Sequence, residues 1–150
     1  RKVKIKPKTL NIIKKGLYQV VNQRKGTAWW YRGKGLQMAG KTGTSQVVRI
    51  GSDKIYSKCE DYDYKLRHHG VFVSFAPIKN PKIAVSVVVE HGCHGSSAAA
   101  PVAKAVTTTF MEKYYPELRK KNIEKEKLAL QKLMKKLEEE KRKKELEKES

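Results

Sequence analysis

The chain has 150 residues, 39% of them hydrophobic, and carries a formal net charge of +19. This length suits one domain with a hydrophobic core, and the longest apolar runs are far too short to cross a bilayer. The two cysteines, Cys59 and Cys93, lie far apart in the sequence and neither require nor exclude a disulfide.

Most of the positive charge belongs to the first part of the chain. Residues 117–150 contain 13 Lys or Arg and 9 acidic residues, so residues 1–116 keep +15. An excess of this size suggests a polyanionic partner, but the basic residues are scattered and match no nucleic-acid-binding motif. We therefore predict no nucleic acid partner. The excess charge then suits either a surface near an anionic membrane or simple solubility.

The first predicted element is a helix over residues 9–23. Apolar residues recur at helical spacing in this stretch, and Thr9 is a suitable N-cap after an extended basic segment, residues 1–8. Gly16 lies inside the helix, where a glycine costs about 1 kcal/mol relative to alanine. It indicates either close packing against a neighbouring element or a glycine that the helix simply tolerates.

An aromatic loop follows the helix. Residues 22–35 contain glycines and the run Trp29, Trp30 and Tyr31, a composition typical of a loop. These aromatic side chains either form a wall of a substrate groove or, as the simpler interpretation, cover the core or a contact with another domain. They lack the spacing of a platform on which nucleic-acid bases stack.

The next stretch, residues 36–48, predicts a strand with an unusual set of side chains. Alternate side chains of a strand share a face, so Thr42 and Thr44 would place two hydroxyls on one face while Lys41 points the other way. Gly43 has no side chain and lets another group approach the main chain. These residues suit an anion or a peptide laid along the edge of a sheet.

The same stretch matches the phosphate-loop pattern G-x-x-x-x-G-K-[ST] over residues 35–42. A phosphate loop needs a helix that opens at the lysine, because the N-terminal N–H groups of that helix hold the phosphates. Here glycine and β-branched residues follow Lys41, a composition that favours a strand. We therefore set nucleotide binding aside as the interpretation of this motif.

The second half of the chain predicts two more strands, a helix and a charged tail. A long polar connection, residues 51–69, leads to a hairpin of strands 71–76 and 83–89, whose apolar character predicts helices on both faces of the sheet. A helix over residues 98–114 would cover one face and end at Pro116. The tail beyond it is rich in Lys, Glu and Leu and indicates a solvated helix or disorder.

Histidines near Cys93 suggest a zinc site, which their spacing argues against. His91 and His94 flank Cys93, and His68 and His69 are adjacent. Three ligands within four residues of a glycine-rich turn lack the spacing of zinc fingers. We predict no metal and no cofactor, and we interpret these side chains as polar loop residues.

Four segments together resemble the end of a class B penicillin-binding protein, most closely its elongation-type members: residues 26–28, 36–48, 70–77 and 80–85. The resemblance covers about residues 9–115. It implies an α+β fold, the C-terminal portion of the penicillin-binding transpeptidase (serine β-lactamase-like) fold, with three antiparallel strands and flanking helices. Residues 1–116 would be the C-terminal part of a transpeptidase domain, and residues 117–150 a charged helical or disordered tail outside the family pattern.

The resemblance implies a peptidoglycan D,D-transpeptidase, which cross-links stem peptides through a serine acyl-enzyme and is inhibited by β-lactams. In that family pattern the N–H of Thr44 stabilises the oxyanion, and the hydroxyls of Thr42 and Thr44 hold the substrate carboxylate. Lys41 supplies positive potential to the site. Gly43 makes room for the ligand, and Gln46 lines the groove.

The sequence departs from this family at the decisive point. No serine in it opens an S-x-x-K or S-x-N motif, which carry the nucleophile and its partners. The chain also begins with arginine rather than methionine. We therefore expect a fragment that is inactive alone, from a parent anchored by a missing N-terminal segment at the periplasmic face of the bacterial inner membrane.

The expected partners are peptidoglycan stem peptides, β-lactam antibiotics and, through the parent, membrane proteins of the elongation machinery. An alternative from another functional class is a non-catalytic, transpeptidase-like interaction module. Such a module would bind a partner through its basic surface or its charged tail. An S-x-x-K motif followed by S-x-N upstream of Arg1 would favour the enzyme, and their absence would favour the module.

Overall fold

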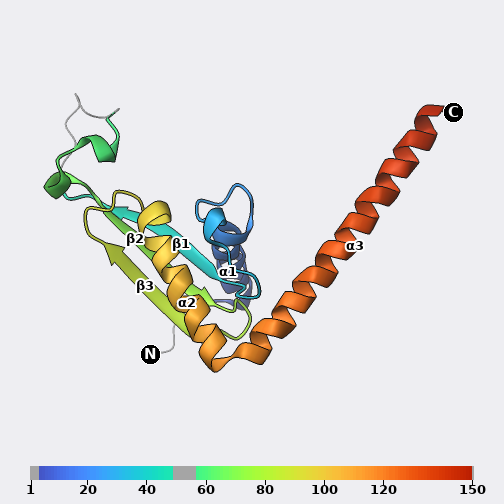
Figure 1. Cartoon of the computed structure of the whole chain (residues 1–150), viewed down its shortest axis with the longest axis horizontal. Helices are drawn as coiled ribbons and strands as arrows, with labels where there is room; N and C mark the ends of the chain where they lie inside the picture. Colours follow the sequence, from blue (N-terminus) through green and yellow to red (C-terminus); the bar gives the residue numbers. More distant parts are fainter. Residues whose placement is uncertain (1–3, 49–56, 150) are drawn as a thin grey trace.

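The computed structural model describes residues 4–48 and 57–149, without the side chains of residues 147–149. Figure 1 shows a three-stranded sheet with helices beside it and one long helix that projects away from the body. The main elements are α1 (Pro7–Asn22), β1 (Ala39–Ser45), β2 (His69–Ala76), β3 (Ile83–Val89), α2 (Ala100–Tyr114) and α3 (Pro116–Glu149). Within these residues, no helix is both long enough and apolar enough to span a membrane.

The sheet is antiparallel throughout, in the order β1-β2-β3. Lys41 of β1 pairs with Val73 of β2, and Phe72 of β2 pairs with Thr42 on one side and with Val87 of β3 on the other. The predicted α+β fold with three antiparallel strands and flanking helices is confirmed. In this sheet β1 is an edge strand, so Lys41, Thr42 and Gly43, called the Lys-Thr-Gly element below, lie where a ligand can approach.

The hydrophobic core lies on one face of the sheet. Phe72 is fully buried there, together with Val21 of α1, Leu36 and Met38 of the loop before β1, and Met111 of α2. Figure 1 shows α2 running across β2 and β3, and fully buried alanines on α2 allow this close approach. Burial of a large apolar side chain contributes about 1.5–3 kcal/mol, so this cluster fixes the sheet against both helices.

The opposite face of the sheet is less covered than the sequence predicted. Val73 of β2 and Val88 of β3 lie on it and are 46% and 60% exposed. The prediction of helices over both faces is therefore wrong for these two strands within the residues described. A valine-rich run reports strand propensity, but it does not specify what packs on each face.

Two of the predicted boundaries that differ from the structure are the first residues of helices. Helix α1 begins at Pro7 rather than after Thr9, since proline is well suited to the first turn of a helix. Helix α2 begins at Ala100 rather than at residue 98, because a π-helical turn over Gly95–Ala99 precedes it. The end of α2 at Tyr114 agrees with the prediction, and Pro116 opens α3 after the break at Tyr115, where φ is −139°.

The base of α3 is attached to the loop before β1. Glu126 Oε2 accepts a hydrogen bond from the N–H of Gly35 at 3.0 Å, and Asn122 Nδ2 donates to the carbonyl of Gly35 at 3.1 Å. Gly35 has φ +72°, and a Cβ there would lie 2.6 Å from Ile123. The charged tail is thus helical, and it is anchored at one end rather than solvated throughout.

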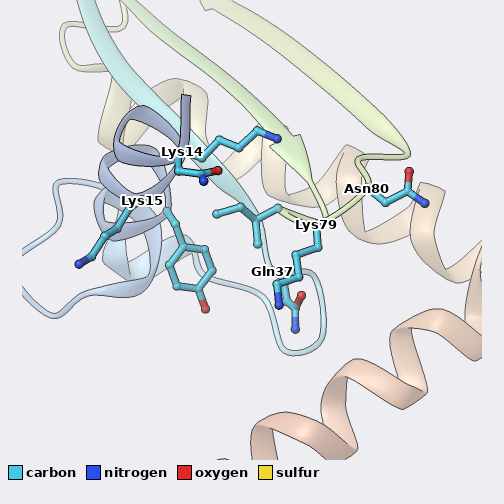
Figure 2. A pocket seen from close by; sticks show the side chains of 8 residues that line it. Lys14, Lys15, Gln37, Lys79 and Asn80 are labelled. Carbon is cyan, nitrogen blue, oxygen red and sulfur yellow. The ribbon is translucent and has the colours of Figure 1, made fainter. Parts of the chain in front are cut away.

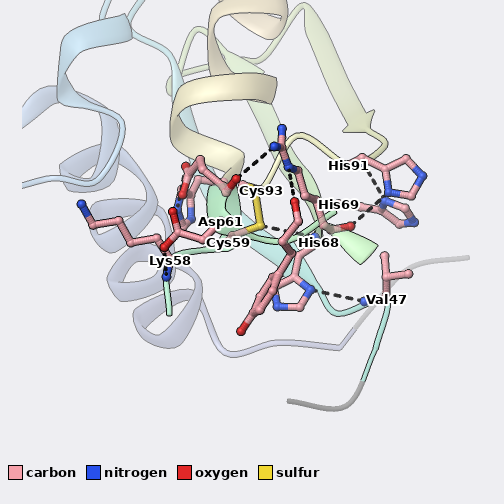
Figure 3. Close-up of a disulfide and its surroundings, with 12 residues drawn as sticks. Val47, Lys58, Cys59, Asp61, His68, His69, His91 and Cys93 are labelled. Atoms are coloured by element: carbon pink, nitrogen blue, oxygen red, sulfur yellow. Dashed lines mark hydrogen bonds and ion pairs between the residues drawn. A yellow bond between two sulfur atoms is a disulfide. The ribbon is translucent and has the colours of Figure 1, made fainter. Parts of the chain in front are cut away.

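A disulfide joins Cys59 to Cys93 with an S–S distance of 2.14 Å, a pairing that the cysteine spacing alone left open. Figure 3 shows this bond tying the segment after residue 57 to the turn that follows β3. The second half of the predicted polar connection forms two short 3-10 turns, Cys59–Asp61 and Tyr64–Leu66. Residues 51–56 of this connection lie outside the described part of the chain. In the part of the chain that the structure describes, no group of three or more His, Cys, Asp or Glu is arranged to hold a metal ion.

Candidate functional site

The candidate site is centred on strand β1. Thr42 and Thr44 pair with Phe72 and Gly70 of β2, so both hydroxyls project from the same face of the sheet, as the strand period predicts. Lys41 projects from the other face. Lys41 and Thr44 are exposed and Thr42 is half-buried, so a ligand can reach all three from the edge of the sheet.

Lys41 lies over its own strand and beside α1. Its Nζ donates a hydrogen bond to the carbonyl of Thr42 at 2.7 Å. It also lines a hollow of about 330 Å³ together with the second half of α1, including Gly16. A Cβ on Gly16 would meet nothing within 4 Å, so this glycine is tolerated and borders open space rather than packing closely.

Thr27 joins the site although no sequence pattern selects it as a site residue. Its hydroxyl lies 3.0 Å from the hydroxyl of Thr42. The N–H of Ala28 donates to the carbonyl of Val20 at 3.0 Å, which fastens this segment to the end of α1. The short Gly-Thr-Ala run at residues 26–28 was the available signal, but it does not reveal which strand residue Thr27 touches.

Glycines bring the turn before α2 close to the strands of the site. A Cβ on Gly95 would lie 2.5 Å from the carbonyl oxygen of Gly43, and a Cβ on Gly70 would lie 2.8 Å from the carbonyl oxygen of His94. Neither contact leaves room for a side chain. By contrast, a Cβ on Gly43 would make only ordinary contacts, the nearest at 3.5 Å to Val71, so the face of β1 that also bears Lys41 has room beside Gly43.

The end of the strand is held by a histidine beside the disulfide. Gln46 follows the last residue of β1 and is exposed. The N–H of Val47 lies 3.5 Å from Nδ1 of the buried His68, a contact drawn in Figure 3. The N–H of His68 in turn donates to Sγ of Cys59 at 3.4 Å. The disulfide therefore stabilises the segment that leaves the candidate site.

A separate basic hollow of about 670 Å³ lies between α1 and the hairpin of β2 and β3. Its described lining contains no acidic residue and includes Lys14, Lys15 and Lys79. Figure 2 shows that Lys14 and Lys15 point to different sides, so the positive charges do not converge on one position. Tyr18 borders this hollow, and its pKa is raised by burial and, to a lesser extent, by the charge of Glu126.

Most of the chain matches one family of known proteins. The family described as the penicillin binding protein transpeptidase domain matches residues 1–108. Among curated proteins, the peptidoglycan D,D-transpeptidase MrdA of Haemophilus influenzae is 34% identical over 111 residues, which cover 73% of this chain and 17% of that protein. MrdA of Acinetobacter baumannii is 45% identical over 86 residues, 57% of this chain and 12% of that protein.

Solved structures give the same family. The penicillin-binding protein PBP2 of Helicobacter pylori, in a complex with MreC, superposes with a TM-score of 0.60 at 32% identity over 72% of this chain and 18% of that chain. PBP2 of Pseudomonas aeruginosa, in complex with WCK 5153, gives 0.57 at 34% identity over 76% of this chain and 22% of that chain. The chain therefore spans less than a quarter of the length of each of these four relatives.

Proposed function

Because the chain belongs to the penicillin-binding protein transpeptidase family, we propose that it is the C-terminal part of an elongation-type peptidoglycan D,D-transpeptidase. It supplies one wall of the active site, and other parts of the parent supply the nucleophilic serine. The observation that carries this proposal is the edge strand β1, which presents Lys41, Thr42 and Thr44 beside the open main chain of Gly43.

The proposed reaction is an acyl transfer between stem peptides. The serine attacks the penultimate carbonyl of a stem that ends in D-Ala-D-Ala, the terminal D-Ala leaves, and an amine of a second stem takes the acyl group. The hydroxyls of Thr42 and Thr44 hold the terminal carboxylate. The N–H of Thr44 donates to the oxyanion, which stabilises the negative charge of the developing tetrahedral centre.

The remaining residues of this wall supply positive charge, orient the Thr42 hydroxyl or line the substrate groove. Lys41 adds positive potential to the site from the other face of β1, and its exposed ammonium has no acidic neighbour among the described ion pairs. Thr27 orients the hydroxyl of Thr42 through their mutual hydrogen bond. Gln46, exposed at the end of β1, lines the groove along which the stem lies.

The proposed location is the periplasmic face of the bacterial inner membrane. The disulfide between Cys59 and Cys93 supports an oxidising compartment, because disulfides are rare in proteins of reducing compartments. The proposed ligands are peptidoglycan stem peptides and β-lactams. The structure of H. pylori PBP2 with MreC supports a protein partner from the elongation machinery.

The test is acylation of the longer protein by a fluorescent penicillin. We expect labelling that is strongly reduced by Lys41→Ala and unchanged by Lys8→Ala, an exposed lysine at the start of α1. The isolated chain should show no covalent adduct by intact mass after treatment with benzylpenicillin, since it contains no S-x-x-K serine. Labelling that is equal in all variants would remove Lys41 from the site.

A second candidate function is a non-catalytic interaction module. The observation that favours it is an exposed apolar stripe on α3, at positions one helical turn apart, formed by Leu130, Leu133, Met134 and Leu137. Under this alternative, the longer protein is not acylated by penicillin. It would still bind a protein partner, and binding would be lost when these four residues are replaced by glutamine.

A further inference from the structure

A groove lies between the aromatic loop, α1 and the base of α3. It has a volume of about 720 Å³ and is lined by Tyr18 of α1, by residues 29–30 and 32–34 of the loop and by Leu130 of α3, among others. Ligand sites in proteins measure about 300–1,000 Å³, so the groove is large enough for a small ligand. Trp29 and Trp30 both line it, and they are the only tryptophans of the chain.

Trp30 has the surroundings of a stacking platform. Its side chain is 78% exposed, and its ring centroid lies 4.8 Å from that of Trp29 in an edge-to-face arrangement. The guanidinium of Arg32 covers the ring of Trp29 at 3.6 Å and donates to the Trp29 carbonyl at 3.0 Å. Arg32 therefore contacts both the ring and the carbonyl of Trp29, and the ring of Trp29 packs against the exposed ring of Trp30.

The polar groups around this platform are mainly hydrogen-bond donors. Arg32 and Lys34 are exposed and border the groove. Its one acidic lining residue, Glu126, already accepts the N–H of Gly35. The groove thus offers an aromatic face beside cationic donors, an arrangement that suits a ligand with an apolar face and several acceptor oxygens.

We propose that this groove binds the glycan strand of peptidoglycan, a chain of β-1,4-linked N-acetylated amino sugars. The inference rests on the proposed function, because a transpeptidase substrate carries its stem peptides on such a strand. The C–H face of a pyranose ring packs on Trp30. The hydroxyl and acetamido oxygens of the sugar accept hydrogen bonds from Arg32 and Lys34.

The position of the groove relative to β1 fits a single substrate. Thr27 touches Thr42 of the candidate site, and the N–H of Trp29 donates to the carbonyl of Gly26 at 3.1 Å in the same turn. Trp30 is three residues beyond Thr27, which limits their separation to about 11 Å. A stem peptide of a few residues spans this distance, so its peptide end can lie along β1 while its sugar lies on Trp30.

The experiment is a fluorescence titration of this chain with the tetrasaccharide of N-acetylglucosamine. Both tryptophans lie in the groove, so the emission reports on this site alone. We expect a saturable change, and a much weaker one with maltotetraose, which has no acetamido groups. Trp30→Ala should weaken binding at least about fivefold, as followed by calorimetry and by the remaining Trp29, while Trp30→Tyr should retain part of it.

The matched control is Tyr114→Ala, which removes an exposed aromatic ring of α2 outside the groove and should bind the tetrasaccharide like the unaltered chain. The proposal is overturned by the absence of a saturable change up to millimolar sugar, by equal binding of Trp30→Ala, or by a response to a stem peptide but not to the sugar. Penicillin labelling of the longer protein reports separately on the proposed function, since it requires no glycan.

Discussion

The hydroxyls of Thr27 and Thr42 lie 3.0 Å apart, although the two residues are 15 positions apart and come from different elements. Either oxygen can be the donor. The bond links the loop after α1 to the strand that carries the candidate site. It therefore limits the rotation of the Thr42 hydroxyl, which in the proposed mechanism holds the substrate carboxylate.

Removal of the Thr27 hydroxyl should slow acylation without unfolding the protein. A hydrogen bond of this kind contributes about 0.5–1.5 kcal/mol, so we expect Thr27→Val to lower the rate of penicillin acylation of the longer protein about two- to tenfold. Thr27→Ser should keep most of the rate. Thr109→Val, at an exposed position of α2, is the control, and a Thr27→Val rate equal to that of this control would contradict the prediction.

The attachment of α3 at Gly35 should contribute measurably to stability. Asn122→Ala leaves the buried carbonyl of Gly35 without its side-chain donor, which costs about 1–3 kcal/mol. Gly35→Ala should cost a similar amount, because alanine is strained at φ +72° and its Cβ meets Ile123. Urea unfolding monitored by tryptophan emission measures both, with the exposed Gln131→Ala as control; a midpoint for Asn122→Ala equal to that of the control would show that the attachment is weak.

Reduction of the disulfide should destabilise the chain. Cys59 and Cys93 are 34 residues apart, and a cross-link over a loop of this order contributes about 2–4 kcal/mol. We expect a clear fall in melting temperature when a reductant is added. The double variant Cys59→Ser, Cys93→Ser should melt at the lower temperature with or without reductant. A reductant effect that persists in the double variant would point to another cause.

Stability should also fall at alkaline pH through Tyr18. Burial, followed by the charge of Glu126, raises the pKa of Tyr18 above its ordinary value of 10.0. The folded state therefore favours the neutral phenol, so this stabilisation is complete below about pH 10 and is lost as the pH rises through the higher folded pKa. Denaturation midpoints across this range should fall more steeply for the unaltered chain than for Tyr18→Phe. Glu126→Gln should make the fall in stability with pH less steep. Parallel curves for the unaltered chain and Tyr18→Phe would contradict a contribution of Tyr18 to this fall.

Local patterns predicted that all three strands exist, although β1 (Ala39–Ser45) is shorter than the predicted stretch 36–48. The span of β3 agrees at both ends with the predicted strand, and Thr42 and Thr44 share a face as expected. These results depend on strand propensity and on the fixed two-residue period of a strand, which need no knowledge of distant residues. The Lys-Thr-Gly element itself was identified by the resemblance of the surrounding segments to a known family, and its role stays a prediction.

Contacts between distant residues were beyond the reach of the sequence patterns. The contacts of Thr27 with Thr42 and of Gly35 with Asn122 join positions 15 and 87 residues apart, and no local pattern encodes them. The cysteine spacing likewise left the disulfide open, because pairing depends on how the fold brings the two side chains together. The roles of Lys41, Gly43 and Gln46 stay predictions until acylation is measured.

Helix α3 is attached near its base to the loop that leads into β1, through the hydrogen bonds of Asn122 and Glu126 with Gly35. From Glu126 to Glu149 the helix rises about 35 Å at 1.5 Å per residue, while Gly35 lies within hydrogen-bonding distance of Glu126. A displacement of several ångströms at the C-terminal end of α3 therefore corresponds to a rotation of only a few degrees about its base. Because the contacts with Gly35 lie at the base of α3, such a rotation displaces the loop before β1 far less than it displaces the far end of the helix.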